Sequence, residues 1–295
     1  MSLCEQAQFA ESCGYESIWL PENHFGANAL PDPLTLLASM AGATRSIRLG
    51  TTSYLLTLRN PLQAAEQVAV LDQLSGGRLI LGVGRGYAPE MLRAFHVPAK
   101  EKRRIFAWTL GLMKDAWSGK SISLDGNMEH AVEVHPRPLQ QPHPPLWVAA
   151  FGPKALAQAG TLGLPYLCSP MESIATLENN YAQHVQAAEA AGIAAPSVIP
   201  LMRTVFVSEN AELLSEVKNS LAEKSENVRL LDGEGVDDWT LIGTPGQVRV
   251  KLQNYQERIG MTHLVATRLR IGGIDEADLR RSVTLLADIV AGKVI

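Results

Sequence analysis

The spacing of apolar residues along the chain changes repeatedly between the periods typical of strands and of helices. Short, nearly continuous apolar runs, typical of parallel strands buried on both faces, begin near residues 17, 47, 78, 146, 166, 198 and 263. Apolar residues three or four positions apart predict helices over residues 34–44, 61–74, 101–117, 174–191, 211–223, 245–259 and 276–291. No linker-like change of composition interrupts this alternation, so it predicts an α/β fold with a parallel sheet.

The number of strands bears on the architecture. Strand–helix alternation over the whole chain favours a single domain, residues 1–295, with a TIM-type (β/α)8 barrel, which needs eight strands. The apolar runs supply seven, and the missing one is the first, because the chain starts within a helix that ends at Gly14. Either that strand lies upstream of residue 1, or the barrel is incomplete or is completed by another segment.

Two stretches depart from the strand–helix alternation. Residues 121–135 alternate around Asp125-Gly126, which predicts a hairpin appended to the main architecture. Residues 227–239 are polar, contain glycine and have no clear period, so they are expected to form a surface loop.

Residues 71–87, LDQLSGGRLILGVGRGY, contain the most informative pattern of the chain. The Ser-Gly-Gly run ends a helix, and the apolar run after it predicts a buried strand. Gly82, Gly84 and Gly86 then leave the backbone open to close approach and present Arg85 beside it, an arrangement suited to an anion. The spacing G-x-G-x-G differs from the dinucleotide-binding G-x-G-x-x-G. A tight turn with a solvated arginine remains an alternative.

Composition narrows the possible classes. With 26 basic and 30 acidic side chains, the net charge of -4 leaves no basic excess to bind nucleic acid. Cys4, Cys13 and Cys168 do not have the number or spacing of a disulfide framework or a zinc site, and the histidines are not paired at ligand spacing, so no metal is assigned. The chain has no leader pattern and no apolar run of membrane-spanning length, so we expect a cytoplasmic protein that does not bind membranes.

Several motifs occur in the order of a known family. The segments WLPENHF (residues 19–25), IRLGT (47–51), LDQLSGGR (71–78), GVGRG (82–86) and GTP (243–245) resemble the bacterial luciferase-like flavin monooxygenases. The resemblance covers essentially the whole chain. It implies a (β/α)8 barrel that binds reduced FMN, or in a sister branch the deazaflavin F420, at the C-terminal ends of the strands.

The resemblance also assigns cofactor-binding residues near two strand ends. Thr52 and Ser53 match a strand end that often holds a non-proline cis peptide and supports the isoalloxazine ring. Gly84, Arg85 and Gly86 match a loop whose arginine contacts the flavin phosphate or its surroundings.

A third cofactor-binding segment lies at the start of a helix. Phe151, Gly152, Lys154 and Ala155 match a phosphate-binding segment of the family. Free N–H groups and the positive end of the helix dipole also make a helix N-terminus a suitable anion site. Without the resemblance, a solvated charge is the favoured interpretation of Lys154, and with it phosphate contact is an equal alternative.

The chain departs from the pattern of the family at the candidate catalytic residues. Luciferases carry two adjacent histidines after the glutamate, the first of which acts in acid–base chemistry, and this chain has Asn23 and His24 there. Histidine is a residue type suited to moving a proton near neutral pH, but a buried, hydrogen-bonded structural role is the alternative for His24. Luminescence with long-chain aldehydes is not expected.

The resemblance leads to one main functional hypothesis. The sequence GLPYL at residues 163–167 is similar to the alkanal monooxygenase branch, which favours FMN. We expect a monooxygenase that receives reduced FMN from a separate NAD(P)H flavin reductase, uses O2 to oxygenate a small organic substrate, and forms a homodimer. An F420-dependent hydride-transfer oxidoreductase and a non-catalytic flavin-binding relative are the alternatives. The composition of the pocket loops, residues 23–33, 87–100 and 227–239, does not identify the substrate.

Overall fold

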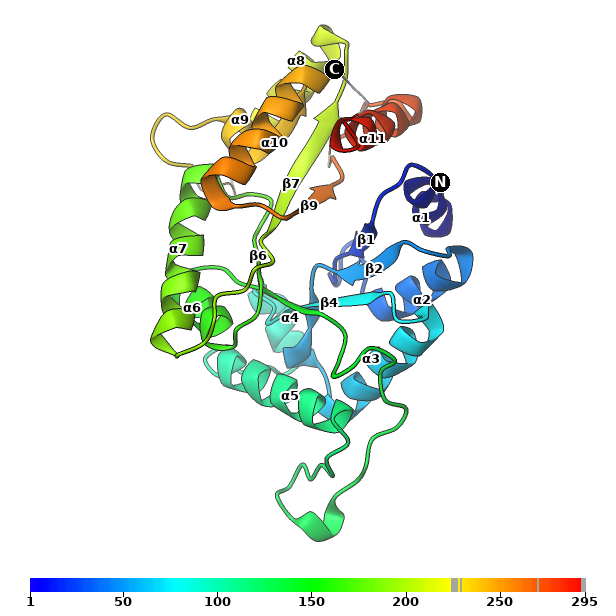
Figure 1. The fold of residues 1–295 in the computed structure, drawn as a ribbon, viewed down its shortest axis with the longest axis vertical. Helices are drawn as coiled ribbons and strands as arrows, with labels where there is room; N and C mark the ends of the chain where they lie inside the picture. The colour runs from blue at the N-terminus through cyan, green and yellow to red at the C-terminus, as the bar shows by residue number, and fades with distance from the viewer. Residues whose placement is uncertain (224–227, 229, 270, 293–295) are drawn as a thin grey trace. The chain divides into compact units, whose positions relative to one another are not determined.

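Parallel strands organise the chain in each of two compact units, residues 1–149 and 150–295 (Figure 1). The structure is a computed structural model that describes residues 1–223, 228, 230–269 and 271–292. Within these residues, no helix has the length and apolar character needed to cross a membrane. The prediction of one domain over residues 1–295 stays a prediction.

The sheet of the first unit has the strand order β1-β2-β4-β5, and all its pairings are parallel. Its strands are β1 (Ser17–Leu20), β2 (Arg48–Thr51), β4 (Leu79–Gly84) and β5 (Leu146–Ala149), with the short β3 (Tyr54–Leu55) pairing with β4. Leu20 pairs with Thr51, and Leu55 pairs with Gly84. Because the strands are parallel, their C-terminal ends lie along one edge of the sheet.

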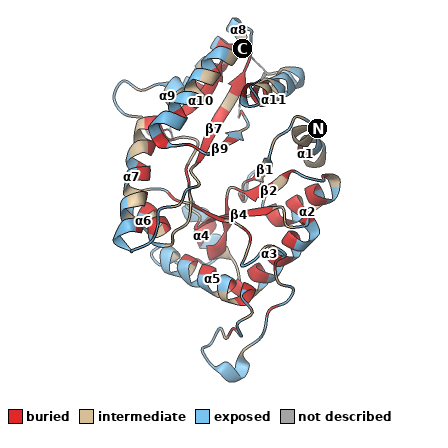
Figure 2. Cartoon of the chain, viewed as in Figure 1, coloured by how far each residue is buried: buried red, intermediate tan, exposed pale blue. Residues whose placement is uncertain are grey.

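Helices alternate with the strands of this unit, with their buried residues toward the sheet (Figure 2). They are α1 (Leu3–Ser12), α2 (Pro33–Ala43), α3 (Pro61–Ser75), α4 (Pro89–Ala94) and α5 (Lys102–Trp117), with 3-10 turns at η1 (Leu56–Leu58) and η2 (Met128–His130). The start of α3 shows why such helices form where they do. Asn60 accepts hydrogen bonds from the N–H groups of Leu62 and Gln63, and Pro61 occupies the first turn.

The motif at residues 71–78 has a structural role before the strand begins. Gly76 ends α3 in the left-handed conformation (φ 68°). Asp72 is fully buried and accepts hydrogen bonds from the backbone N–H and side chain of Gln140. Arg78 donates to the carbonyl oxygens of Ala41 and Ile47. These contacts fix the entry into β4, which carries the glycine-rich end.

The second unit has a three-stranded parallel sheet in the order β8-β7-β9. The strands of this sheet are β7 (Pro200–Val207), β8 (Thr240–Gly243) and β9 (His263–Thr267). The unit also contains the short strand β6 (Tyr166–Leu167), which is not part of this sheet. Its helices are α6 (Pro153–Thr161), α7 (Ile174–Ala190), α8 (Ala211–Glu223), α9 (Val236–Trp239), α10 (Pro245–Ile259) and α11 (Glu276–Val290). A buried apolar cluster that includes Phe206, Val217, Trp239 and Ile242 packs α8 and α9 against β7 and β8.

The structure confirms the predicted α/β fold of parallel strands, and all seven predicted strands are present. It adds β3 and β8, which the sequence pattern did not indicate. The helix α1 precedes β1, as predicted. Closure of the strands into a barrel stays a prediction.

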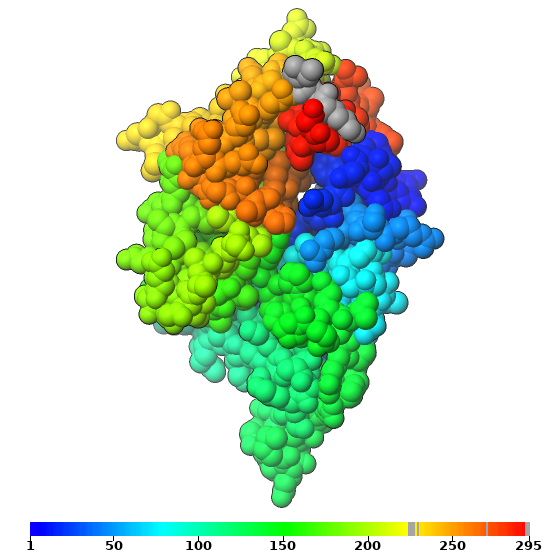
Figure 3. Space-filling model, viewed as in Figure 1, coloured from blue at the N-terminus to red at the C-terminus, as the bar shows by residue number. Residues whose placement is uncertain are grey.

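The two irregular stretches are only partly as expected. In residues 121–135, Ile122 and Val132 form an isolated antiparallel bridge, and η2 lies between them, so the hairpin is reduced to one bridge. This stretch projects from the rest of the first unit (Figure 3). In residues 227–239, positions 227 and 229 lie outside the described residues, and the end of the stretch is the helix α9 with a buried Trp239. The indole packs into the apolar cluster, which is why this end is not an open loop.

Candidate functional site

The C-terminal edge of the first unit's sheet brings several predicted site residues together. Thr52, which follows β2, donates its N–H to the carbonyl oxygen of Leu20 at the end of β1, at 2.8 Å. Ser53 lies against the end of β4, because a Cβ added to Gly84 would be 2.1 Å from the hydroxyl oxygen of Ser53. Position 84 therefore has no room for a side chain.

The backbone at this edge has the form that the family resemblance implied. The Thr52–Ser53 peptide bond is cis and does not involve proline. Gly86, two residues past Gly84, has a φ of 69°, and a Cβ there would be 2.4 Å from the methyl carbon of Met91. Gly84 is therefore favoured by close packing, whereas Gly86 is favoured by its left-handed conformation, because the flexible Met91 side chain could move aside.

Arg85 is buried and not solvated, so the alternative of a tight turn with a solvated arginine is wrong. Only 6% of Arg85 is exposed, and its guanidinium lies over the ring of Phe106 with its central carbon 4.5 Å from the ring centroid. Its Nη1 donates to the carbonyl oxygen of Ala149 at the end of β5, at 3.0 Å. Burial, with a smaller effect of Arg103, lowers the pKa of Arg85 to about 10, so it stays a cation at neutral pH.

A buried carboxylate holds the candidate catalytic histidine. The side chain of Glu22, just after β1, is fully buried, and its Oε1 lies 2.9 Å from Nε2 of His24 and 2.7 Å from Nη2 of Arg59. Its Oε2 accepts the backbone N–H of Leu55 at 2.9 Å. The ring of His24 also meets Phe95 edge-on, at 4.9 Å between centroids. The side chain of His24 is thus 7% exposed and hydrogen-bonded. This environment agrees with a structural role for His24 and does not exclude proton transfer.

This geometry defines what His24 can do chemically. While Glu22 is ionised it can only accept hydrogen bonds, so Nε2 of His24 carries a proton. In the neutral ring, Nδ1 is then the acceptor. The pair Glu22–His24 therefore presents a nitrogen that can take up a proton, in a fixed orientation.

Asn23 has a different environment. Its backbone N–H donates to the carbonyl oxygen of Leu30 at 3.2 Å, and its Oδ1 accepts the N–H of Leu30 at 2.5 Å. Asn23 therefore closes the loop between β1 and α2, while its side chain remains exposed.

Glu22 and Arg59 are site residues that the sequence analysis did not select. One available signal was the position of Glu22, a carboxylate directly after a buried strand and Pro21. The partnership itself was not visible, because Arg59 lies 37 residues away along the chain. Arg59 directly precedes Asn60, the N-cap of α3. The start of α3 therefore fixes the position of the Arg59 backbone, from which its side chain contacts Glu22.

The predicted phosphate-binding residues lie at the N-terminus of α6 in the second unit. Gly152 is the N-cap with a φ of 83°, and no side chain caps this end of the helix. Pro153 occupies the first turn, Lys154 is exposed, and the N–H of Ala155 donates to the carbonyl oxygen of Gly152. Phe151 is 53% exposed just before the helix. The segment is accessible to an anion from solvent.

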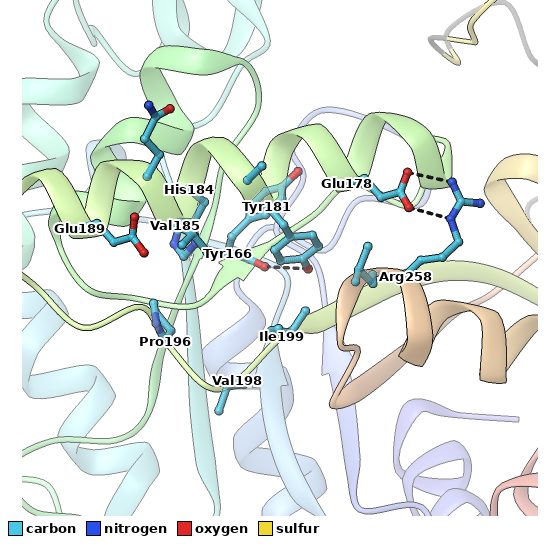
Figure 4. A pocket seen from close by; sticks show the side chains of 13 residues that line it. Tyr166, Glu178, Tyr181, His184, Val185, Glu189, Pro196, Val198, Ile199 and Arg258 are labelled. Atoms are coloured by element: carbon cyan, nitrogen blue, oxygen red, sulfur yellow. Dashed lines mark hydrogen bonds and ion pairs between the residues drawn. The ribbon is translucent and has the colours of Figure 1, made fainter.

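The second unit also contains a hollow of about 440 Å³, shown in Figure 4. Its walls include Tyr166, Tyr181 and Ile199, and at its rim Arg258 donates two hydrogen bonds to Glu178, at 2.7 and 2.8 Å. Tyr166 begins β6 and Ile199 directly precedes β7, so the hollow lies at the N-terminal ends of these strands. No predicted site residue lines it. Among the described residues, no group of three or more His, Cys, Asp or Glu side chains is placed to hold a metal ion.

The first unit is thus an α/β assembly whose charged and glycine-rich strand ends meet at the C-terminal edge of a parallel sheet, where such folds place their sites. More particularly, the model of the luciferase-like monooxygenase family matches residues 2–263. The chain belongs to this family.

The relatives that match this chain have names that give different activities, and one of them names F420. The uncharacterised protein y4wF of Sinorhizobium fredii is 32% identical over 70% of this chain and 63% of its own length. The alkanal monooxygenase alpha chain of Photorhabdus laumondii is 29% identical over 57% of this chain and 47% of its own length. The F420-dependent glucose-6-phosphate dehydrogenase of Kineococcus radiotolerans is 30% identical over 89% of this chain and 86% of its own length. The chain spans less than two thirds of the length of the first two of these relatives.

Solved structures match the chain over almost its whole length. The monooxygenase RslO1 from Streptomyces bottropensis has a TM-score of 0.82 and 25% identity, covering 98% of this chain and 92% of its own. The oxygenating constituent of 3,6-diketocamphane monooxygenase from Pseudomonas putida, solved with FMN, has a TM-score of 0.77 and 20% identity, covering 99% and 92%. The chain therefore has the α/β fold of the luciferase-like monooxygenases.

Proposed function

We propose that this protein is a flavin-dependent monooxygenase that uses reduced FMN and O2 to oxygenate a small organic substrate. The observation that carries the proposal is the buried Glu22–His24 pair at the sheet edge that also holds Ser53, Gly84 and Arg85. The family to which the chain belongs supports the reaction class.

The residues at the sheet edge fit a flavin ring system. The strand ends at Thr52, Ser53 and Gly84 offer backbone with little side-chain bulk, and Arg85 supplies a fixed buried cation beside them. Such a cation suits the anionic form of a reduced flavin or its phosphate-bearing chain. At the N-terminus of α6, which no side chain caps, the positive end of the helix dipole and Lys154 have the chemistry of a phosphate site.

Bound reduced FMN supplies the electrons that activate O2, and the chain's own residues do the remaining work. Glu22 orients His24, and Nδ1 of His24 accepts or returns a proton at the reacting atoms. Arg59 shares Oε1 of Glu22 and so limits how far the carboxylate can move. The edge-on contact with Phe95 keeps one side of the imidazole dry.

The proposal includes the partners that go with this activity. A separate NAD(P)H flavin reductase supplies reduced FMN, the enzyme acts as a homodimer in the cytoplasm, and it binds neither nucleic acid nor membranes. The second candidate function is an F420-dependent hydride transfer that needs no O2. It is favoured by the F420-dependent relative, which matches 89% of this chain, against 57% for the alkanal monooxygenase alpha chain.

A coupled assay tests the proposed function. The protein is supplied with FMN, NADH, a flavin reductase and ¹⁸O₂, together with decanal, cyclohexanone or 2-naphthol in separate reactions. We expect at least one compound to gain one ¹⁸O atom, seen by mass spectrometry, only when protein, reductase and FMN are all present. No labelled product with any of them, together with substrate reduction by reduced F420 without O2, would contradict the proposal in favour of the second candidate.

The variant His24→Gln serves as the mechanistic control in the same assay. It keeps a hydrogen-bonding side chain against Glu22 but cannot take up a proton. Product formation is expected to fall about 100-fold or more, the scale of a lost general acid–base group, while FMN binding is retained. Flavin binding without turnover in the unmodified protein would instead support the non-catalytic flavin-binding relative.

A further inference from the structure

Two aromatic side chains with exposed faces lie beside the candidate proton-transfer residue of the first unit. Phe25 is 68% exposed and Phe95 is 39% exposed. Their rings are stacked, with centroids 5.8 Å apart and planes 22° from parallel. The ring of His24 contacts both, at 5.7 Å from Phe25 and 4.9 Å from Phe95. Exposed apolar surface of this kind, next to a site, needs an explanation.

The loop that carries Phe25 holds it in a costly conformation. Phe25 has a φ of 66°, in the left-handed region that favours glycine and that bulky residues rarely adopt. The hydrogen bonds of Asn23 to Leu30 close the loop around it, and Gly26 accepts the N–H of Ala29. Backbone strain of this kind is usually retained at functional sites, where the position of the side chain matters.

The helix end that carries Phe95 shows the same feature. Phe95 is the C-cap of α4, and His96 after it has a φ of 55°. The N–H of Val97 donates to the carbonyl oxygen of Leu92 and that of His96 to Arg93, the two bonds of a helix end that normally has glycine at the left-handed position. Phe25 and His96 are the two non-glycine residues with positive φ in the described part of the chain.

The residues around Phe95 are anchored in a buried apolar cluster. Leu92 and Val97 are buried in a cluster with Leu55 and Met91. The backbone on either side of Phe95 is therefore fixed, yet its ring is directed outward to stack on Phe25 rather than into the cluster. Two separate segments thus place their aromatic rings side by side. Each segment contains one residue with an unfavourable positive φ, Phe25 in the first and His96 in the second.

We propose that Phe25 and Phe95 form the substrate-binding surface and that the substrate is a planar aromatic molecule, which stacks on these rings beside His24. The inference rests on the proposed function, because His24 is the residue assigned to proton transfer. Phe25 and Phe95 stack on each other, but they remain 68% and 39% exposed, so their outer faces are open to another ring. Aromatic rings prefer offset-stacked and edge-to-face partners, which a planar aromatic molecule supplies. An aliphatic chain would gain only apolar contact there. The substrate class is therefore aromatic rather than alkanal.

The test measures binding without turnover. Equilibrium dialysis of 2-naphthol and of decanal against the full chain, with no reductant, compares the unmodified protein with Phe25→Leu and Phe95→Leu. Both variants keep apolar volume and remove the ring. Trp108→Leu is the matched control, since Trp108 is an exposed aromatic side chain of the same unit on α5.

We expect 2-naphthol to bind more tightly than decanal and to lose roughly 2- to 10-fold in affinity in each Phe variant, the scale of a lost aromatic stack. Decanal affinity should change by less than about twofold, and Trp108→Leu should leave both ligands unaffected. Unchanged 2-naphthol affinity in both Phe variants, equal losses for the two ligands, or tighter binding of decanal would overturn the proposal.

A further variant separates binding from folding. Phe25→Gly removes the ring but also relieves the positive φ, so the protein is expected to unfold at the same temperature or higher while losing 2-naphthol affinity. A variant that retains 2-naphthol affinity would count against the proposal. Because no cofactor is turned over, aromatic binding can be established even if the oxygenation assay fails, and the two proposals fail independently.

Discussion

Two cations assigned to anion binding have opposite environments. Arg85 is buried, stacked on Phe106 and bonded to Ala149, so its replacement would disturb the ends of β4 and β5 as well as any ligand. Lys154 is exposed in the first turn of α6, where its replacement should leave the fold intact. At the scale of single residues, Lys154 therefore gives the cleaner test of phosphate binding.

Lys154→Ala is expected to weaken FMN binding about fivefold, because one charge-assisted contact to the phosphate is lost at an exposed site. Riboflavin, which lacks the phosphate, should bind the variant and the unmodified protein equally well. Flavin fluorescence titrations measure both affinities, and Lys114→Ala, an exposed lysine on α5, is the control. An equal loss for riboflavin, or no loss for FMN, would remove α6 from the phosphate site.

For single residues, the sequence was sufficient to select site residues within the family motifs. It did not reveal contacts between residues that are far apart along the chain. Gly84 and Ser53 were selected from the family resemblance, and the structure packs them against each other. His24 was selected too, but both of its alternatives remained open until its partner was known. That partner, Glu22, is held in place by Arg59 and by the N–H of Leu55. Both are distant from Glu22 in the sequence, and only folding places them next to it.

At the scale of elements, a single carboxylate joins α1 to the segment that leads into β2. Oε1 of Glu11 accepts the backbone N–H groups of Arg45, Ser46 and Ile47, at 3.0, 2.6 and 2.9 Å. These bonds, foremost those from Ser46 and Ile47, lower the pKa of Glu11 to about 2. The ionised carboxylate therefore stabilises the start of the sheet.

The pH dependence follows from the direction of this shift. The folded-state pKa of Glu11, about 2, lies below the ordinary value of 4.5, so its stabilisation is complete above pH 4.5 and is lost as the pH falls toward 2. Glu11→Ala should lower the free energy of unfolding at pH 7 by about 1 to 2 kcal/mol, allowing for partial exposure.

Urea unfolding at pH 7 and at pH 3 measures this effect, with the exposed Glu66→Ala on α3 as control. The difference between Glu11→Ala and the unmodified protein should be smaller at pH 3. A difference that stays constant or grows as the pH falls would show that the carboxylate is not the source of the stability.

Some elements were visible in the sequence and others were not, for a physical reason. The helix from Pro245 has a capping box, with Thr244 and Gln247 bonding each other's backbone, and its start was predicted from Thr244-Pro245. The strand β8, Thr240–Gly243, has only four residues directly before that cap. It exists because β7 pairs with it in parallel over its whole length, a contact that no local pattern encodes.

At the scale of the whole molecule, the fold was predictable because alternating strands and helices leave few arrangements. The cofactor is a different matter. One solved structure with this fold was determined in complex with FMN, and one sequence relative is named as F420-dependent. Both cofactors carry phosphate and a flat ring system, so an anion site and open strand ends suit either, and only affinity distinguishes them.

Reduced FMN, in preference to reduced F420, is the cofactor that we propose for this protein. Titrating the purified protein with each reduced cofactor under anaerobic conditions, and following the change in absorption, tests it most directly. We expect reduced FMN to bind at one molecule per chain and at least about tenfold more tightly than reduced F420, a difference of about 1.4 kcal/mol. Tighter binding of reduced F420, or no binding of reduced FMN, would contradict it.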